Sequence, residues 1–253
     1  MSDPPRRPVV VVTGGSRGIG AATCLLAAER GFDVAVGYVS DAAAGAAVVD
    51  RCRSDGAEAV AVQVDVSDES QVIALFDRTV EELGRVDALV NNAAVLYPLA
   101  RVEDLTVERM RRTFEVNVFG AILCGREAVR RMSTARGGDG GAIVNISSGA
   151  ARLGSPNAYV EYAAGKAALD TFTVGLAKEV ALEGIRVNGV RPGYTLTEQH
   201  ARIGEPDRMP ELGPTIPMQR AGEPEEIATG IVWLLGEEAS YVTGAILDIT
   251  GGR

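Results

Sequence analysis

Tyr162, Lys166 and Ser148 are three side chains whose types and spacing suit one kind of proton chemistry. Tyr162 and Lys166 are four residues apart, so on a helix they lie on the same face. An ammonium group beside a phenol favours the phenolate, so Lys166 is expected to lower the pKa of Tyr162 from about 10 toward the range of an acid/base catalyst. The hydroxyl of Ser148, fourteen residues before Tyr162, would hold a carbonyl oxygen beside the phenol. These groups fit hydride transfer, in which a cofactor carries the hydride and the protein handles the proton.

A glycine-rich segment, residues 13–20, follows an apolar run and precedes a helical pattern. Its glycines let the backbone approach a pyrophosphate, and the N-terminus of the helix supplies free N–H groups for the phosphates. The spacing G-x-x-x-G-x-G has no Lys-Ser/Thr ending, which argues against the P-loop of a kinase or nucleotidase. The nucleotide-binding residues expected here are Gly14, Ser16, Arg17, Gly18, Ile19 and Gly20.

The chain resembles the short-chain dehydrogenase/reductase family along essentially its full length. Besides residues 13–20 and the Tyr162–Lys166 pair, the resemblance is carried by Asp65, residues 91–94, Asn117, residues 143–148 and residues 191–193. Two positions depart from the family pattern: Ala94 stands where Gly is usual, and Gly165 stands where a Ser commonly precedes the Lys. The resemblance implies an NAD(P)-dependent oxidoreductase that acts on CH–OH groups and assembles as a homotetramer.

The catalytic residues of the family match four positions of this chain, Asn117, Ser148, Tyr162 and Lys166. Ser148 is preferred to Ser147 because neighbouring side chains of a strand face opposite ways, so only one of them faces the cleft. Tyr159 is set aside because no lysine stands four residues after it. By resemblance, Asn117 positions a water that links Lys166 to solvent. The alternative is a structural hydrogen bond from the buried amide to a neighbouring strand.

The resemblance also assigns cofactor contacts to the ends of the strands. The side chain of Asp65 would meet the adenine amine, since residues 67–68 offer a better cap for the next helix. Residues 91–94 would lie along the adenosine ribose, and the backbone at residues 191–193 would hold the nicotinamide carboxamide. Beyond the glycine-rich segment, the expected cofactor-binding residues are Tyr38, Asp65, Val66, Asn91, Ala93, Tyr162, Lys166, Pro192, Gly193 and Thr195.

Tyr38 indicates which nicotinamide cofactor is preferred. It ends the second expected strand, where NAD-selective folds often place an acidic residue that accepts from the ribose 2′-OH. With no carboxylate at this position, a 2′-phosphate is not repelled, and Arg17 is placed to meet it. The alternative for Arg17 is a solvated side chain. NADP(H) is therefore the preferred cofactor, with NAD(H) as the alternative.

Apolar runs alternate with amphipathic stretches from one end of the chain to the other. Buried strands are expected at 9–13, 34–38, 59–64, 88–91, 142–147, 185–190 and 245–249, and helices at 18–31, 41–55, 68–83, 106–134, 158–183 and 224–235. This alternation predicts an α/β fold with a Rossmann-type doubly wound parallel sheet of about seven strands and helices on both faces. Residues 1–253 are expected to form a single NAD(P)-binding domain.

One long segment, residues 194–222, has no regular pattern and is rich in proline, glycine and charge. Loops of this length in compact domains are usually lids or binding loops. Because the segment starts at the nicotinamide end of the expected cleft, it is expected to be a substrate lid. The alternative is an inert surface insertion. Specificity is expected to depend on this segment and on Leu96, Tyr97, Arg152 and Leu153.

Composition excludes several kinds of partner and site. The net charge of −9 argues against nucleic acid or an anionic membrane, since both need clustered Lys and Arg. No run of eighteen apolar residues is present and the first eight residues lack a signal-peptide core, so a cytoplasmic location is expected. The only histidine, His200, cannot build a histidine zinc site, and no metal is expected. Cys24, Cys52 and Cys124 are expected to be buried free thiols.

Three functions are weighed against these observations. The leading one is an NADP(H)-dependent oxidoreductase for a small-molecule ketone or aldehyde and its alcohol, either a 3-oxoacyl-thioester reductase or a sugar or small-alcohol dehydrogenase. The second is a nucleotide-binding sensor with the same fold and little turnover, against which the complete catalytic set argues. A serine hydrolase is excluded because there is no G-x-S-x-G motif and His200 lies in the expected lid.

Overall fold

The chain folds around one sheet of seven parallel strands in the order β3-β2-β1-β4-β5-β6-β7. The computed structural model describes residues 6–253; residues 1–5, which belong to the stretch without a signal-peptide core, lie outside the described residues. The strands are β1 (Val9–Val12), β2 (Asp33–Tyr38), β3 (Ala59–Gln63), β4 (Ala88–Asn91), β5 (Gly141–Ile146), β6 (Ile185–Pro192) and β7 (Ile246–Ile249). The order reverses between β1 and β4, and sheets of this kind bind ligands beyond the carboxyl ends of the strands at such a point.

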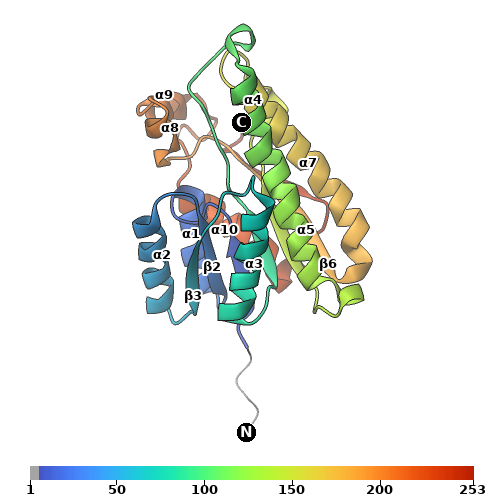
Figure 1. The fold of residues 1–253 in the computed structure, drawn as a ribbon. Helices are drawn as coiled ribbons and strands as arrows, with labels where there is room; N and C mark the ends of the chain where they lie inside the picture. Colours follow the sequence, from blue (N-terminus) through green and yellow to red (C-terminus); the bar gives the residue numbers. More distant parts are fainter. Residues whose placement is uncertain (1–5) are drawn as a thin grey trace.

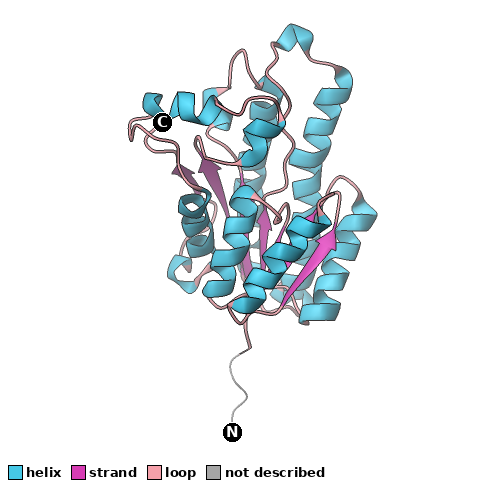
Figure 2. Cartoon of the chain, turned by 90° about the vertical axis from the view of Figure 1, so that its left-hand side faces the viewer, coloured by secondary structure: helices cyan, strands magenta, loops and turns pink. Residues whose placement is uncertain are grey.

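Helices cover both faces of the sheet (Figure 1). One face is covered by α1 (Gly18–Glu29), α2 (Ala42–Ser54) and α10 (Pro224–Leu235). The other is covered by α3 (Glu69–Leu83), by α4 (Val107–Phe114), η2 (Glu115–Gly120) and α5 (Ala121–Met132) in one continuous rod, and by α7 (Val160–Val180). Figure 2 shows the strands lying between these layers. Throughout residues 6–253, no helix is both long enough and apolar enough to cross a membrane.

Shorter helical pieces connect the larger elements. They are η1 (Val102–Asp104), η3 (Thr134–Arg136), α6 (Ala150–Leu153), η4 (Ala181–Glu183), α8 (Glu198–Arg202), α9 (Arg208–Leu212), η5 (Gly213–Thr215) and η6 (Glu237–Ala239). Both α8 and α9 lie beyond the carboxyl end of the sheet (Figure 1). They therefore sit on the side of the molecule where a ligand is expected.

Alternate residues of the central strands contribute to two separate cores. In β1, Val10 and Val12 belong to the core under α1, α2 and α10, whereas Val11 belongs to the core under α3, α5 and α7. Burial on both faces explains why these strands read as unbroken apolar runs. The cysteines are free and buried as expected, Cys24 and Cys52 in the first core and Cys124 in the second.

The predicted fold is confirmed, and two predicted segments differ in detail. The helix expected at 106–134 is continuous, but its middle section, η2, is a π-helix. At the end of η2, Gly120 contacts the connection after β3, where an added Cβ would lie 2.6 Å from Val66 Cγ2. The segment 194–222, expected to be irregular, contains α8 and α9. Pro206 lies between these two helices, in agreement with the effect of proline on helix continuity.

Candidate active site

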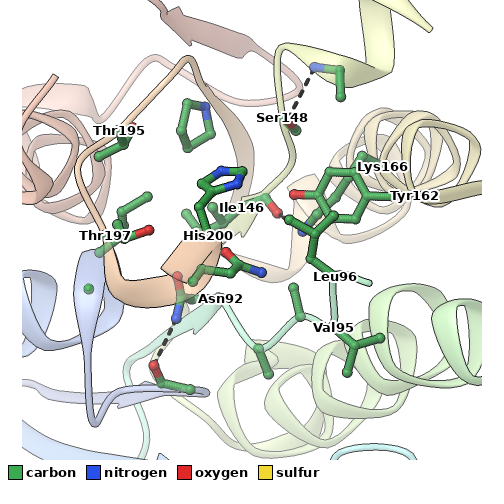
Figure 3. A pocket seen from close by; sticks show the side chains of 18 of the residues that line it. Asn92, Val95, Leu96, Ile146, Ser148, Tyr162, Lys166, Thr195, Thr197 and His200 are labelled. Carbon is green, nitrogen blue, oxygen red and sulfur yellow. Dashed lines mark hydrogen bonds between the residues drawn. The ribbon is translucent and has the colours of Figure 1, made fainter. Parts of the chain in front are cut away.

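A cavity of about 810 Å³ opens beyond the carboxyl ends of the strands where their order reverses. Its walls come from the loops after β1 and β4, the end of β5, α7 and the segment 194–222. Figure 3 looks into the cavity, with Tyr162 and Lys166 on one side and Thr195 and Thr197 on the other. A cavity of this size is within the range usual for small-molecule and cofactor sites.

The glycine-rich loop lies at one end of the cavity with its backbone exposed to the interior. Gly14 and Gly18 line the cavity with φ values of 64° and 51°, which other residues rarely adopt. Gly20 lies behind the loop, where an added Cβ would be 2.2 Å from the carbonyl oxygen of Gly14. The side chain of Asn92 donates hydrogen bonds to the carbonyls of Thr13 (3.0 Å) and Gly14 (2.9 Å). Only glycines therefore allow α1 to pack this closely beneath a loop that β4 also holds.

The N-terminus of α1 faces the cavity without a side-chain cap. Free N–H groups and the positive end of the helix dipole favour an anionic group at such a place. Thr197 closes the site from the opposite side, since a Cβ added at Gly18 would lie 3.3 Å from its Cγ2 atom. A glycine cradle and an uncapped helix N-terminus, with Thr197 opposite them, fit the pyrophosphate of a dinucleotide.

Tyr38 and Arg17 lie at the outer end of the cavity, as expected for the adenosine ribose. A carboxylate that the sequence reasoning overlooked lies beside them: Asp41 Oδ2 is 3.4 Å from Arg17 Nη2. Asp41 also caps α2, because its other oxygen accepts a hydrogen bond from the Ala44 N–H at 3.0 Å. Position 38, at the end of β2, has no carboxylate, but Arg17 already has an anionic neighbour in Asp41.

Asp65 lines the cavity with its carboxylate held in place. One oxygen accepts from both the N–H and the hydroxyl of Ser67, and the other accepts from Arg112. Although partial burial opposes ionisation, these hydrogen bonds keep the pKa of Asp65 below its usual range. The cap of α3 is Asp68, which accepts from Ser70 and Gln71 N–H groups, so Asp65 is not needed as a cap.

Ser147 and Ser148 separate after β5 as the strand geometry predicts. The Ser147 side chain is buried and donates a hydrogen bond to the Lys166 carbonyl at 3.0 Å. The Ser148 hydroxyl lies in the cavity and accepts a hydrogen bond from the Ala150 N–H at 3.1 Å. Ser148 is therefore the serine that a ligand in the cavity can reach beside Tyr162.

Lys166 and Tyr162 project from consecutive turns of α7 toward the end of β5. The Lys166 ammonium donates a hydrogen bond to the Ile146 carbonyl at 2.6 Å and lies 5.6 Å from the centre of the Tyr162 ring. Burial lowers the pKa of Lys166 to about 8. Burial also raises the pKa of Tyr162 to about 12, and a hydrogen bond with Ser148 opposes this only in part. The pKa of Tyr162 is therefore raised rather than lowered as expected, because desolvation of the phenol outweighs the effects of its neighbours.

Asn117 lies in the π-helical section behind the wall of the cavity. Its side chain is buried, accepts a hydrogen bond from the Val95 N–H (2.8 Å) and donates one to the Val95 carbonyl (3.0 Å). This is a structural bond of the kind weighed as the alternative, although its partner is a loop rather than a strand. Sections of π-helix occur frequently at functional sites. The paired bonds fix Val95, which lines the cavity opposite α7.

Asn91 is also buried behind the wall, and its side chain does not reach the cavity. It donates hydrogen bonds to the Ala121 carbonyl at 3.0 Å and to Asn145 Oδ1 at 2.9 Å. The following residue, Asn92, lines the cavity instead. Asn91 thus ties β4 to β5 and to α5, and holds the loop that forms this wall.

Most of the predicted site residues line one cavity. They are Gly14, Ser16, Arg17, Gly18, Ile19, Tyr38, Asp65, Val66, Ala93, Ser148, Tyr162, Lys166, Pro192, Gly193 and Thr195. Gly20, Asn91 and Asn117 are the exceptions, and each shapes the backbone behind the wall.

The lining side chains that were missed or set aside include Tyr159, Thr197, His200 and Arg208. Tyr159, at the N-cap of α7, meets Tyr162 edge to face, with ring centres 6.4 Å apart. The other three belong to the segment 194–222. The composition of that segment signalled a lid, but no spacing rule indicated which of its side chains point inward.

Known proteins with similar sequences and structures share this arrangement over nearly their whole length. The family described as enoyl-(acyl carrier protein) reductase matches residues 14–253. The chain is 52% identical to the uncharacterized oxidoreductase YgfF of Escherichia coli, over 97% of this chain and 99% of that protein. It is 43% identical to cis-4-hydroxycyclohexanecarboxylate dehydrogenase of Sinomonas cyclohexanicum, over 96% and 95%. A solved short chain dehydrogenase from Burkholderia cenocepacia in complex with NADP is similar, with 35% identity, a TM-score of 0.87 and coverage of 98% and 97%.

Proposed function

Because this chain belongs to the short-chain dehydrogenase/reductase family and is a nicotinamide-dependent oxidoreductase, we propose that it transfers a hydride between NADP(H) and a ketone/aldehyde–alcohol pair with Tyr162 as the acid/base. One observation carries the proposal: Ser148, Tyr162 and Lys166 line the same cavity as the glycine cradle. A proton-handling group and a nucleotide site thus share one enclosed space, as hydride transfer requires.

The cofactor would lie along the cavity from Tyr38 to Tyr162. The loop of residues 14–20 and Thr195 would hold the pyrophosphate, Asp65 the adenine, and residues 192–193 the nicotinamide carboxamide. When bound, the nicotinamide supplies or accepts the hydride. Arg17 and the lack of a carboxylate at Tyr38 support NADP(H) over NAD(H), and the NADP complex of the Burkholderia relative supports the same choice.

The residues of the chain would handle the substrate oxygen and its proton. The Ser148 hydroxyl holds the carbonyl oxygen, and the Tyr162 hydroxyl donates a proton to that oxygen during reduction. In the reverse direction, the phenolate takes the proton from the alcohol. Because burial holds the pKa of Tyr162 near 12, the phenol is in its donor form at neutral pH. Oxidation requires the phenolate, which burial of Tyr162 disfavours.

Lys166 and Asn117 would complete a proton path behind Tyr162. The ammonium of Lys166 would stabilise negative charge on the phenol oxygen and would contact the ribose hydroxyls of the cofactor. Asn117 would position a water that connects Lys166 to solvent, and the π-helical section supports this role because it changes the direction of the backbone groups around Asn117.

The substrate would be a small carbonyl compound or its alcohol. The relatives include a cis-4-hydroxycyclohexanecarboxylate dehydrogenase and a 3-oxoacyl-[acyl-carrier-protein] reductase, so ring alcohols and acyl thioesters are both candidate chemistries. We further propose a cytoplasmic homotetramer. Free buried thiols suit a reducing compartment, and α4 and η2 expose Val107 and Phe119, each 59% accessible, as an apolar face for a second copy.

The direct test is NADPH oxidation with a panel of aldehydes, cyclic ketones, sugars and a 3-oxoacyl thioester. Turnover of at least one of them that is lost in Tyr162→Phe supports the oxidoreductase proposal. Tight NADPH binding with no turnover of any member would favour the nucleotide-binding sensor instead.

A further inference from the structure

Three buried polar atoms in the cavity have no hydrogen-bond partner. They are the Tyr159 hydroxyl oxygen, His200 Nδ1 and Arg208 Nε, judged over the described part of the chain, 6–253. The Tyr159 side chain is almost completely buried, with the residue 6% exposed. Buried polar groups are nearly always satisfied, so three unsatisfied atoms in one cavity indicate groups that bind something there. Neither the proton path nor the pyrophosphate cradle uses these side chains.

The three side chains lie together beside the catalytic group. The guanidinium carbon of Arg208 is 5.3 Å from the centre of the Tyr159 ring, which itself meets the ring of Tyr162. His200 comes from α8 and also lies in the cavity (Figure 3). The Tyr159 ring therefore contacts both the Arg208 guanidinium and the ring of Tyr162, the proposed proton donor.

Arg208 differs from the other arginines that line the cavity. Three of those are in ion pairs, and the fourth, Arg253, stacks on Tyr194; the three pairs are Arg17–Asp41, Arg112–Asp65 and Arg202–Glu198. Arg208 is in none of the ion pairs found among residues 6–253. Neither Asp207, its neighbour in the chain, nor Glu205, whose charge raises the pKa of Tyr159, forms an ion pair with the guanidinium. The cluster therefore contains a guanidinium that has no ion-pair partner among the described residues.

The protonation states of the two neighbours make them suitable partners for an anion. Burial and the charge of Arg208 lower the pKa of His200 to about 4, so its imidazole is neutral at pH 7. Burial raises the pKa of Tyr159, so its phenol keeps the proton that it would donate. At neutral pH the cluster consists of one planar cation and neutral hydrogen-bonding groups, and Arg pairs with carboxylates in a bidentate geometry.

We propose that the carbonyl substrate carries a carboxylate, which Arg208 binds together with the Tyr159 hydroxyl. This assignment rests on the proposed reductase function and specifies its substrate class as oxo acids and their hydroxy acids. The reacting carbonyl lies at Ser148 and Tyr162, and the acid group lies beyond Tyr159. The distance between the carbonyl position and the carboxylate position therefore determines which substrate length fits. A phosphate of the cofactor is the competing anion, but its cradle is formed by the loop after β1 and Thr197 rather than by Tyr159.

Calorimetric titration of the NADP-loaded protein with benzoate and benzamide tests the anion site without turnover. Benzoate is expected to bind at least tenfold more tightly than benzamide. In Arg208→Gln the affinity for benzoate falls by roughly 10–100-fold, the range of a charge-assisted hydrogen-bonded pair, and the affinity for benzamide is unchanged. Arg208→Lys keeps the charge but not the bidentate geometry, so its affinity for benzoate is expected to lie between those of the wild type and Arg208→Gln. The matched control is Arg220→Gln, an exposed arginine of the same segment outside this cavity, which leaves both affinities unchanged.

Reduction of 4-formylbenzoate and of 4-formylbenzamide by NADPH tests the same assignment during turnover. The wild type prefers the acid, and Arg208→Gln raises KM for the acid alone. Equal binding of benzoate and benzamide by the wild type overturns the proposal. So does a loss of NADP affinity in Arg208→Gln that matches the loss of benzoate affinity, because the anion site then belongs to the cofactor. If benzoate binding depends on Arg208 and no carbonyl compound is reduced, the anion site stands and the reductase function fails.

Discussion

Lys166 on α7 donates a hydrogen bond to the carbonyl of Ile146, the last residue of β5, across 2.6 Å. This bond fixes the ammonium against the edge of the sheet. Ser147 adds a second connection, from its hydroxyl to the Lys166 carbonyl. The helix that carries Tyr162 is therefore tied, at the turn of Lys166, to the strand that ends just before Ser148. Rigid elements thus hold the proposed proton donor and the proposed oxygen-binding hydroxyl, and precise placement of such groups is a large part of catalysis.

Replacing Tyr162 with Phe removes the proton donor but keeps the ring that packs on Tyr159 and Lys166. General acid–base catalysis contributes a factor of about 10²–10⁴, and kcat is expected to fall by that amount. NADPH binding, followed by the fluorescence of Trp233, is expected to stay the same. Unchanged turnover would remove Tyr162 from the mechanism, and an equal loss of cofactor affinity would make its role structural.

His200 is expected to stay uncharged well below neutral pH. Burial and the positive charge of Arg208 lower its folded-state pKa to about 4, whereas an unfolded histidine titrates near about 6.5. The unfolded chain therefore binds the proton first as pH falls from 6.5 toward 4, and the contribution of His200 to stability is lost over that window. As the only histidine, it gives a single NMR signal, which should not titrate between pH 5.5 and 8. In Arg208→Gln, the pKa of His200 is expected to rise. A His200 signal that titrates near pH 6.5 in the wild type would contradict its buried placement.

Asp41→Asn is expected to tighten NADP(H) binding. The change removes the carboxylate 3.4 Å from Arg17, and an asparagine still caps α2. Both side chains are partly exposed, so the gain should be modest, roughly two- to fivefold. NAD(H) affinity, titrated in parallel, should hardly change.

Tyr38→Asp is the opposite change at the same end of the cavity, since it adds a carboxylate where a 2′-phosphate would lie. It should shift the preference toward NAD(H). Tighter binding of NADH than NADPH by the wild type would refute the proposed selectivity.

Residue spacing was sufficient to predict the sheet, because burial on both faces leaves runs such as 9–12 with no polar residue. It also identified the Tyr162–Lys166 pair and the glycine-rich loop, which line one cavity, since both depend on contacts that are local in sequence. The pKa of Tyr162 was predicted in the wrong direction because a pairwise argument contains no desolvation. Burial depends on how α7, β5 and the lid meet in three dimensions.

Asp41, His200 and Arg208 were missed for the same reason. Each matters through a partner that is distant along the chain or on another element: Asp41 through Arg17, and Arg208 through Tyr159. Asn91 shows the converse error, since it follows a strand as a ligand residue would, yet its side chain points into the sheet and bonds Asn145. Position at a strand end predicts proximity to the site but not the direction of the side chain.

The protein is expected to be a tetramer in solution. The rod of α4, η2 and α5 exposes Val107, Phe119 and Ile122, whose apolar surface a second copy would cover. Light scattering should give four times the 26.4 kDa chain mass. Phe119→Asp should produce a smaller species. A wild-type mass of 26.4 kDa at micromolar concentration would contradict the assembly.

The segment 194–222 is expected to act as a lid that becomes more ordered when cofactor and substrate bind. Its two ends are joined, since Thr195 pairs with Gly222 and the Leu196 N–H donates to the Gly222 carbonyl at 2.9 Å. Between them, α8 and α9 have five residues each, too short to be stable without packing. Closure over the cavity would exclude water and control product release.

Hydrogen exchange should show greater protection across 194–222 when NADP and a substrate are added. Deleting residues 203–212 removes α9 with Arg208, and should lower kcat/KM while leaving NADP affinity nearly unchanged, because the pyrophosphate cradle remains. Protection in α10, packed against the sheet, serves as the internal control and should not change. An unaltered exchange rate in 194–222 together with full activity of the deletion variant would identify the segment as an inert insertion.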